Sequence, residues 1–160
     1  MAIKHQQSGM SLVGLLIAMA IIITGVVYVF GSMNFALGTL SDKKQLYQAN
    51  FLAVQKMEAV RNIRDVGEWD TGLGVVTIDT AYHLEQSGTP LTWNLVLGEQ
   101  TVGHFTESVI FNQVFRDAND NITASGGVLD VNTKKITVTI SWPSGSETKN
   151  VELVGILTNW

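Results

Sequence analysis

The sequence has 160 residues, with 10 Lys and Arg against 14 Asp and Glu, which gives a formal net charge of −4. Charged residues make up only 15% of the chain, below the roughly 25% of a typical soluble domain, and hydrophobic residues reach 46%. This composition argues against a disordered chain and against a broad basic face for nucleic acid. Because the sequence contains no cysteine, disulfides, thiolate metal sites and cysteine nucleophiles are excluded.

The first third of the sequence contains a long stretch without formal charge. No Asp, Glu, Lys or Arg lies between Lys4 and Asp42. Within it, residues 12–30 read LVGLLIAMAIIITGVVYVF, which as a helix would span about 28 Å, close to the thickness of a bilayer's hydrocarbon core. The run predicts a membrane helix. Lys4 precedes it, so the positive-inside rule predicts a cytoplasmic N-terminus and an exported remainder.

A cleaved secretory signal is the alternative interpretation of this apolar run. The A-x-A match at residues 18–20 lies in the middle of the run. Cleavage there would leave IIITGVVYVF as an exposed apolar end. The pattern therefore favours an uncleaved span.

The residues before the run carry a more specific pattern. A short polar segment, MAIKHQQSG, ends at Gly9 and is followed directly by Met-Ser-Leu-Val and the apolar helix. This arrangement resembles the N-terminal segment of type IV pilins and type II secretion pseudopilins. The resemblance implies that prepilin peptidase cuts between Gly9 and Met10 and that the same enzyme methylates the new amino terminus, Met10. Glycine suits such a cut because it lets the backbone approach the catalytic groups closely. A plain single-pass anchor that keeps residues 1–9 is the alternative.

One position departs from the family pattern. The family usually has glutamate at the fifth mature position, where this sequence has Gly14. In the family this carboxylate is thought to pair with the methylated amino terminus of a neighbouring subunit, and a carboxylate in hydrocarbon persists only when it is paired. The tip pseudopilin of type II secretion also lacks the glutamate. The resemblance therefore favours a minor, tip-proximal subunit over a major one, with lineage drift as the alternative.

The helix is expected to continue beyond the membrane run. Residues 42–65 read DKKQLYQANFLAVQKMEAVRNIRD, without proline, and their apolar residues recur at spacings of three and four. The pattern predicts an amphipathic helix. Its apolar stripe contains Leu46, Ala49, Ala53, Met57 and Val60, and we expect Tyr47, Phe51 and Val54 to widen it.

After residue 66 the helical periodicity gives way to short strand patterns separated by turn residues. We expect strands at 75–78, 81–84, 91–97 and 104–115, and a turn at 116–121. The clearest strand is 135–142, where alternate apolar residues face one way. A turn at 143–146 and a return strand at 147–157 complete a hairpin.

These elements predict an α+β chain. Its long N-terminal helix, transmembrane in the first half and amphipathic in the second, packs on a small C-terminal antiparallel β-sheet head, which is the pilin fold. The predicted segments are a prepilin leader at 1–9, a transmembrane or filament-core helix at 10–41, its amphipathic continuation at 42–66 and the head at 67–160.

The sequence offers little catalytic chemistry. His83 and His104 have no carboxylate at ligand spacing, and no nucleophile, zinc or phosphate-loop motif is present. We therefore expect no enzyme, no cofactor and no metal. The best cation candidate is Asp117, Asn119 and Asn121, which resembles the start of a calcium loop, although its next residues favour a plain turn. Three tryptophans, Trp69, Trp93 and Trp142, are expected in the core rather than in an adhesive aromatic patch.

The resemblance implies a structural subunit of a type IV pilus or pseudopilus-like filament. Its implied partners are other pilin subunits, met through the N-terminal helix, the prepilin peptidase and an inner-membrane assembly platform. The implied location is the cytoplasmic membrane with a cytoplasmic N-terminus, and then the extracellular filament. Nucleic acid is not an expected partner, although Lys134, Lys135 and Lys149 offer a local site. A membrane-anchored extracellular binding module that forms no filament is the alternative function.

Overall fold

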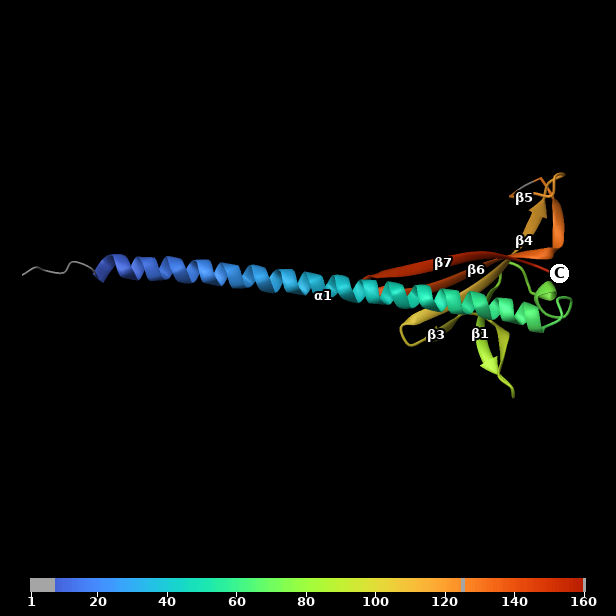
Figure 1. Cartoon of the computed structure of the whole chain (residues 1–160), viewed down its shortest axis with the longest axis horizontal. Helices are drawn as coiled ribbons and strands as arrows, with labels where there is room; N and C mark the ends of the chain where they lie inside the picture. Colours follow the sequence, from blue (N-terminus) through green and yellow to red (C-terminus); the bar gives the residue numbers. More distant parts are fainter. Residues whose placement is uncertain (1–7, 125, 160) are drawn as a thin grey trace, which may run out of the picture. The chain divides into compact units, whose positions relative to one another are not determined.

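The structure, a computed structural model, describes residues 8–124 and 126–159, with side chains from residue 12 on. The chain divides into two compact units, Met1–Lys44 and Gln45–Trp160. Figure 1 shows its elements in sequence colours. They are α1 (Ser8–Val66), η1 (Leu73–Val75), β1 (Ala81–Ser87), β2 (Thr92–Leu97), β3 (Gln100–Val102), β4 (Phe105–Arg116), β5 (Ile122–Thr123), β6 (Val128–Ser144) and β7 (Glu147–Thr158).

Helix α1 runs without interruption through both predicted helical segments. It contains no proline, the residue that would remove a helical hydrogen bond and clash with the preceding turn. Glycines 25, 31 and 38 do not break it, because each costs only about 1 kcal/mol relative to alanine. Of the predicted leader, residues 1–7 lie outside the described residues.

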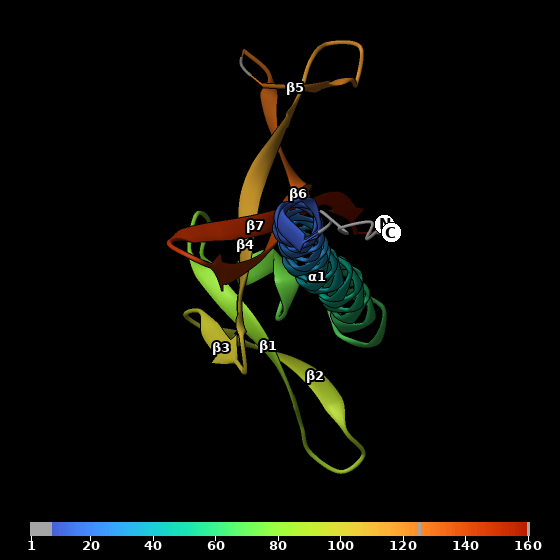
Figure 2. The same cartoon turned by 90° about the vertical axis from the view of Figure 1, so that its left-hand side faces the viewer.

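The head contains one antiparallel sheet with the strand order β2-β1-β4-β6-β7, and the short strands β3 and β5 pair with β4. The β6–β7 pair has the longest register, from Thr133 opposite Thr158 to Ser144 opposite Glu147. Gly145 makes the tight reversal with a positive φ of 65°. In Figure 2, the β1–β2 hairpin and the β4–β5 end of the head extend in opposite directions.

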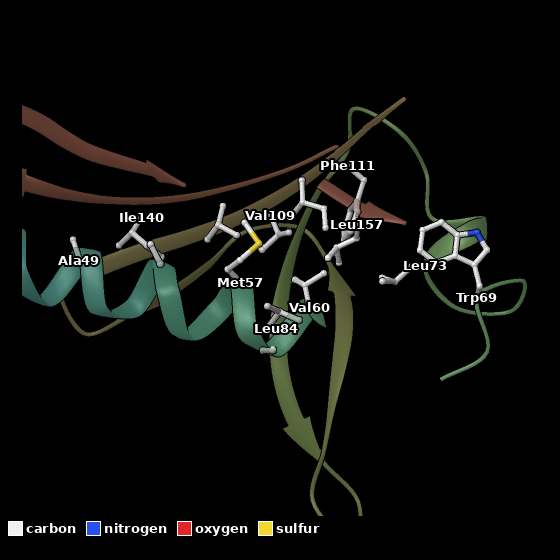
Figure 3. Close-up of a cluster of buried hydrophobic side chains, with 14 of the residues drawn as sticks. Ala49, Met57, Val60, Trp69, Leu73, Leu84, Val109, Phe111, Ile140 and Leu157 are labelled. Atoms are coloured by element: carbon white, nitrogen blue, oxygen red, sulfur yellow. The ribbon is translucent and has the colours of Figure 1, made fainter. Parts of the chain in front are cut away.

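The core lies between one face of this sheet and residues 49–60 of α1 (Figure 3). Alternate residues of β6 supply much of it, because side chains along a strand point to opposite faces in turn. The helix contributes small side chains, Ala49 and Ala53, which let the sheet approach closely. The inward residues of β6 are Ile136, Val138, Ile140 and Trp142, as the alternation predicted. The α+β class and the packing of the helix on an antiparallel sheet are confirmed.

Four expectations about the head need correction. The strand expected at 81–84 continues to Ser87, because residues 85–87 pair with the start of β2. Residues 75–78 do not form a strand; the chain there leaves the 3-10 turn η1, in which Gly74 lies so close to Trp69 that a Cβ would clash. The strand predicted at 135–142 is longer, Val128–Ser144, because its first residues pair with the end of β4 beyond an irregularity at Gln113. The short strands β3 and β5 had no predicted counterpart, since two or three residues carry no readable periodicity.

The predicted helical stripe also needs correction. Of the predicted stripe, Ala49, Ala53, Met57 and Val60 are buried against the sheet, but Leu46 is exposed. Tyr47 and Phe51, expected to widen the stripe, are 73% and 71% exposed. At 100° per residue, positions 47, 51 and 54 are centred about 130° around the helix from the buried stripe, so they do not face the core. They form a second apolar face of the same helix.

Candidate assembly surface

The apolar part of α1 is exposed over all of its described side chains from Leu12 to Gly38. The most apolar window of the helix has a mean hydropathy of 2.7, and none of it is buried. By length and composition this helix is able to cross a membrane, so it is a candidate membrane span.

Three hydroxyls of this segment are hydrogen-bonded to carbonyl groups of the same helix. The Thr24 hydroxyl donates to the carbonyl oxygen of Ala20 at 3.0 Å, and the Ser32 hydroxyl donates to that of Val29 at 2.9 Å. The Thr39 hydroxyl donates to the carbonyl oxygen of Phe35 at 3.0 Å. A polar group in hydrocarbon is tolerated when such a bond replaces water, so these residues are compatible with an apolar environment.

Gly14, the position where the pilin family usually has glutamate, lies in open space on this helix. A Cβ at Gly14 would meet no atom within 4 Å. A longer side chain is therefore sterically acceptable there within the chain. Gly9 and Met10, the predicted cleavage and methylation residues, lie in the first turns of α1, and their side chains are outside the described ones.

The second apolar face of α1 forms a groove with the sheet in the head. Tyr47, Gln48, Phe51 and Leu52 line it from the helix and Phe105 from the start of β4, around a volume of about 390 Å³. Its walls are mostly apolar and aromatic. Large exposed aromatic side chains at helical spacing mark a surface suited to contact with another apolar element.

A buried ion pair connects the helix to the sheet on the other side of α1. Lys56 Nζ lies 2.7 Å from Glu107 Oε2 and donates to the carbonyl oxygen of Leu84 at 3.0 Å. Glu107 Oε1 also accepts from the Leu84 backbone N–H at 3.3 Å. The Lys56 ammonium lies 5.4 Å from the centre of the Trp93 ring. One ion pair thus links α1, β1, β2 and β4.

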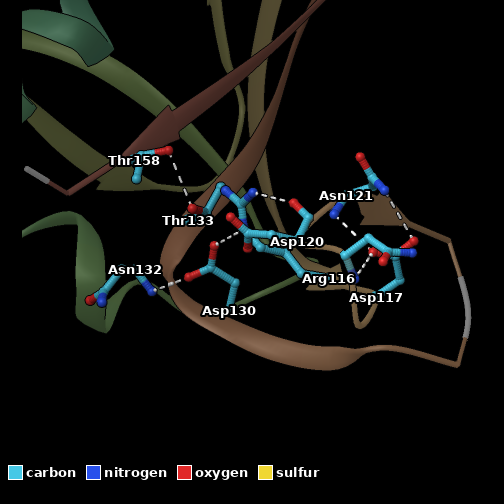
Figure 4. A network of polar contacts seen from close by, with 9 residues as sticks. Arg116, Asp117, Asp120, Asn121, Asp130, Asn132, Thr133 and Thr158 are labelled. Atoms are coloured by element: carbon cyan, nitrogen blue, oxygen red, sulfur yellow. Dashed lines mark hydrogen bonds and ion pairs between the residues drawn. The ribbon is translucent and has the colours of Figure 1, made fainter.

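A polar network holds the opposite end of the sheet, where β4, β5 and β6 meet (Figure 4). Arg116 Nε donates to Asp130 Oδ2 at 2.7 Å, and the Asn132 backbone N–H donates to Asp130 Oδ1 at 3.0 Å. The hydrogen bond from Arg116 lowers the pKa of Asp130, and one from Thr133 lowers it further. Both aspartate oxygens are therefore engaged in their charged form.

The predicted calcium candidate lies next to this network. Asp117 Oδ1 accepts from the backbone N–H groups of Asn119 and Asn121 at 2.8 and 2.9 Å, and Asp117 Oδ2 accepts from Asn121 Nδ2 at 3.3 Å. These bonds, led by the Asn121 N–H, lower the pKa of Asp117. The three residues are brought together, but by the bonds of an aspartate-capped turn. The sequence favoured a plain turn here over a calcium loop, and calcium binding is untested.

The other candidate residues are scattered. His83 is buried, with Nδ1 2.9 Å from the Gly98 carbonyl oxygen and Nε2 3.1 Å from Glu85 Oε1, whereas His104 is exposed. Among the described residues no group of three or more His, Cys, Asp or Glu is placed to hold a metal.

The three lysines of the local nucleic-acid site do not form one patch. Lys134 is nearly buried on the core face of β6, and Lys135 points to the opposite face. Lys149 of β7 lies opposite Trp142 in the strand register. Trp142 is seven residues further along β6 than Lys135, so Lys149 and Lys135 are far apart on the sheet.

Comparisons with protein-family models, with curated proteins and with solved structures found no match. The features above therefore stand on the chain's own residues.

The sequence interpretation missed the Lys56–Glu107 pair. The available signal was the position of Lys56 in the sequence. It lies next to Met57 and between Ala53 and Val60, which are all buried. A lysine on a buried helical face requires a partner, because an unpaired buried charge is costly. The identity of the partner, 51 residues later, was not readable from spacing.

Proposed function

We propose that the chain is a structural subunit of a type IV pilus or pseudopilus-like filament. In this proposal prepilin peptidase cuts after Gly9, Met10 becomes the methylated amino terminus, and subunits assemble through the N-terminal helix. The observation that carries the proposal is the single helix α1. Its first part is apolar, uncharged and unburied, and its last part packs on an antiparallel head.

The second apolar face of α1 supports assembly over simple anchoring. A helix that only tethers a head needs one apolar face there, the face on the sheet. This helix keeps Tyr47, Phe51 and Val54 exposed on the other side. In a filament the apolar helices of neighbouring subunits cover such a face. The proposed partners are accordingly other pilin subunits, the peptidase and an inner-membrane assembly platform.

Gly14 supports a minor, tip-proximal role within that proposal. A subunit without a carboxylate there has nothing to pair with a neighbour's amino terminus. The position has room for a side chain, so its lack of glutamate is not imposed by packing within the chain. The proposed route is insertion in the cytoplasmic membrane with a cytoplasmic N-terminus, followed by extraction into the extracellular filament.

The processing step is tested by replacing the predicted cleavage residue. We expect Gly9→Leu to abolish shortening of the chain and to remove it from sheared filaments, because the side chain blocks approach of the peptidase. Immunoblots of membranes and sheared filaments, in a host with prepilin peptidase, report both effects.

A matched control is Gly38→Leu, which places the same side chain in open space elsewhere on α1. It is expected to leave processing unchanged. A wild-type chain that is never shortened would support the single-pass anchored module instead. Normal shortening of Gly9→Leu would show that the cut does not depend on Gly9, which contradicts prepilin processing.

A further inference from the structure

A second groove in the head lies at the end where β4 and β5 meet (Figure 2). Its volume is about 370 Å³, within the roughly 300–1,000 Å³ of small-ligand pockets. Residues of β4, β5, β6 and β7 line it, and none of α1 does. The groove therefore has the size of a ligand site and is separate from the proposed assembly face of the helix.

The strand register places three of the lining side chains in one row. Asn112 of β4 lies opposite Lys135 of β6, and Lys135 lies opposite Ile156 of β7. Side chains of directly opposite residues in antiparallel strands point to the same face of the sheet. The neighbours of Lys135 along β6, Lys134 and Ile136, belong to the core face, so the row points away from α1. One ligand on this outer face is able to contact all three side chains.

Lys135 gives the groove a positive charge. Of the described residues that line the groove, it alone carries a formal charge. It is exposed, and among the described residues no carboxylate lies within ion-pair distance of it. Beside it, Asn112 Nδ2 donates to Asp79 Oδ1, a bond that fixes the amide and does not use Asn112 Oδ1. The row thus offers a cation to an anionic group and an acceptor to an N–H group.

The other walls of the groove are aliphatic. Ile156 of β7 is 48% exposed and Ile122 of β5 is 49% exposed. Because β5 pairs with β4 and β7 pairs with β6, these two side chains lie on opposite sides of the β4–β6 pair. An aliphatic group placed between them would remove apolar surface of both from water. The groove therefore favours a ligand that carries a carboxylate and an aliphatic group close together.

We propose that this groove binds the C-terminal residue of an extended peptide whose last side chain is aliphatic. The terminal carboxylate contacts the Lys135 ammonium, a charge-assisted bond. The aliphatic side chain lies between Ile122 and Ile156, and a peptide N–H donates to Asn112 Oδ1. Capture of a terminal carboxylate is a recurring mode of peptide recognition. This proposal does not depend on filament assembly.

The test uses the full chain in dodecylphosphocholine micelles and follows the isoleucine methyl signals by NMR. Acetyl-Ala-Ala-Leu with a free carboxylate is titrated, with empty micelles as the blank. The same peptide with a C-terminal amide, and hexanoate, are titrated in parallel. The free-acid peptide is expected to bind with a millimolar or lower Kd and to shift the signals of Ile122 and Ile156. The amide is expected to bind at least tenfold more weakly, because it lacks the charge.

Variants locate the binding, and each changes an exposed side chain. Lys135→Met is expected to weaken it at least tenfold, because it removes the charge and keeps an aliphatic chain of similar length. Lys135→Arg is expected to keep the Kd within threefold. Ile156→Ala is expected to weaken binding at least threefold. The matched control Lys44→Met removes an exposed lysine that does not line the groove and is expected to leave the Kd unchanged.

Several results would overturn the proposal. These are no binding of the free-acid peptide at 10 mM, equal binding of the free-acid and amide peptides, or binding that the folded Lys135→Met chain retains in full. Binding of hexanoate without binding of the peptide would overturn it as well, because the groove would then take a free aliphatic acid.

Discussion

The apolar part of α1 and the head differ in the exposure of side chains of the same kind. Ile21, Ile22 and Ile23 are 58–67% exposed, whereas Ile136 and Ile140 of the head are fully buried. In the head, alternation along β6 directs each apolar residue toward one helix face. In residues 12–40 apolar residues surround the helix on all sides, so no single partner within a chain covers them. The head buries the inward face of its sheet against one stripe of α1, whereas every described side chain of the first segment up to Gly38 is exposed.

The polar groups of the two regions also differ, in how far along the sequence their hydrogen-bond partners lie. In the apolar segment, the hydroxyls of Thr24, Ser32 and Thr39 bond back to the helix that carries them. In the head, Lys56 and Glu107 bond across 51 residues of sequence. Local bonds suit a helix that must be self-sufficient in lipid, and long-range bonds fix how the head's elements meet.

The largest expected effect comes from breaking the buried ion pair. Glu107→Ala should destabilise the head by about 3–5 kcal/mol, because it leaves the Lys56 charge buried and uncompensated. Lys56→Met/Glu107→Leu should recover much of that loss by replacing both charges with apolar groups. All four tryptophans belong to the head, so denaturation followed by tryptophan fluorescence reports on this unit. A loss below about 1 kcal/mol for Glu107→Ala would mean that the pair is solvated.

A charge in the apolar segment should have its effect outside the head. Ile22→Asp should raise the free energy of membrane insertion by about 2.5–3.5 kcal/mol, while the head's unfolding midpoint stays unchanged. Ile22→Leu is the matched control. Membrane fractionation with glycosylation mapping measures the insertion. Equal insertion of the aspartate and leucine variants would show that residues 12–40 do not lie in hydrocarbon.

Two valines of α1 that differ in exposure allow buried and exposed apolar residues to be compared within one helix. Val60 is fully buried and Val54 is 52% exposed. Val60→Ala should cost about 2 kcal/mol from lost burial and the cavity left behind. Val54→Ala should stay within about 0.5 kcal/mol in the isolated subunit. Equal costs for the two variants would contradict the assignment of Val54 to an uncovered face.

The smallest effect is expected from the loop carboxylates. Asp117 and Asp130 have lowered pKa values in the folded head, so they bind protons less readily there than in the unfolded chain. Their stabilisation is present above the ordinary carboxylate pKa of about 4 and is lost as the pH falls through the lower, folded values. Asp130→Asn should lower Tm by a few degrees at pH 7 and flatten its acid dependence. An unchanged slope between pH 7 and pH 3 would exclude this contribution.

Features that depend on periodicity were predictable from the sequence. Helix α1, the inward residues of β6 and the β6–β7 hairpin follow from spacing and turn chemistry alone. The face occupied by Tyr47 and Phe51 was misjudged, because apolar residues at helical spacing were assumed to share one partner. A strand at 75–78 was predicted from β-branched residues, but close packing of Gly74 on Trp69 imposes a turn there.

Features that depend on contacts between distant residues were not predictable. Glu107 pairs with Lys56 only because the register of β4 places it against the helix. Trp93 packs against the core, as the sequence interpretation expected, but its place beside the Lys56 ammonium depends on the helix and β2 meeting.

The central claim is that the chain is a processed filament subunit, and intact-mass spectrometry of the protein from native membranes and sheared filaments tests it most directly. The account predicts a chain that begins with N-methyl-Met10. A chain that keeps residues 1–9 in both fractions would contradict it and would leave a membrane-anchored head.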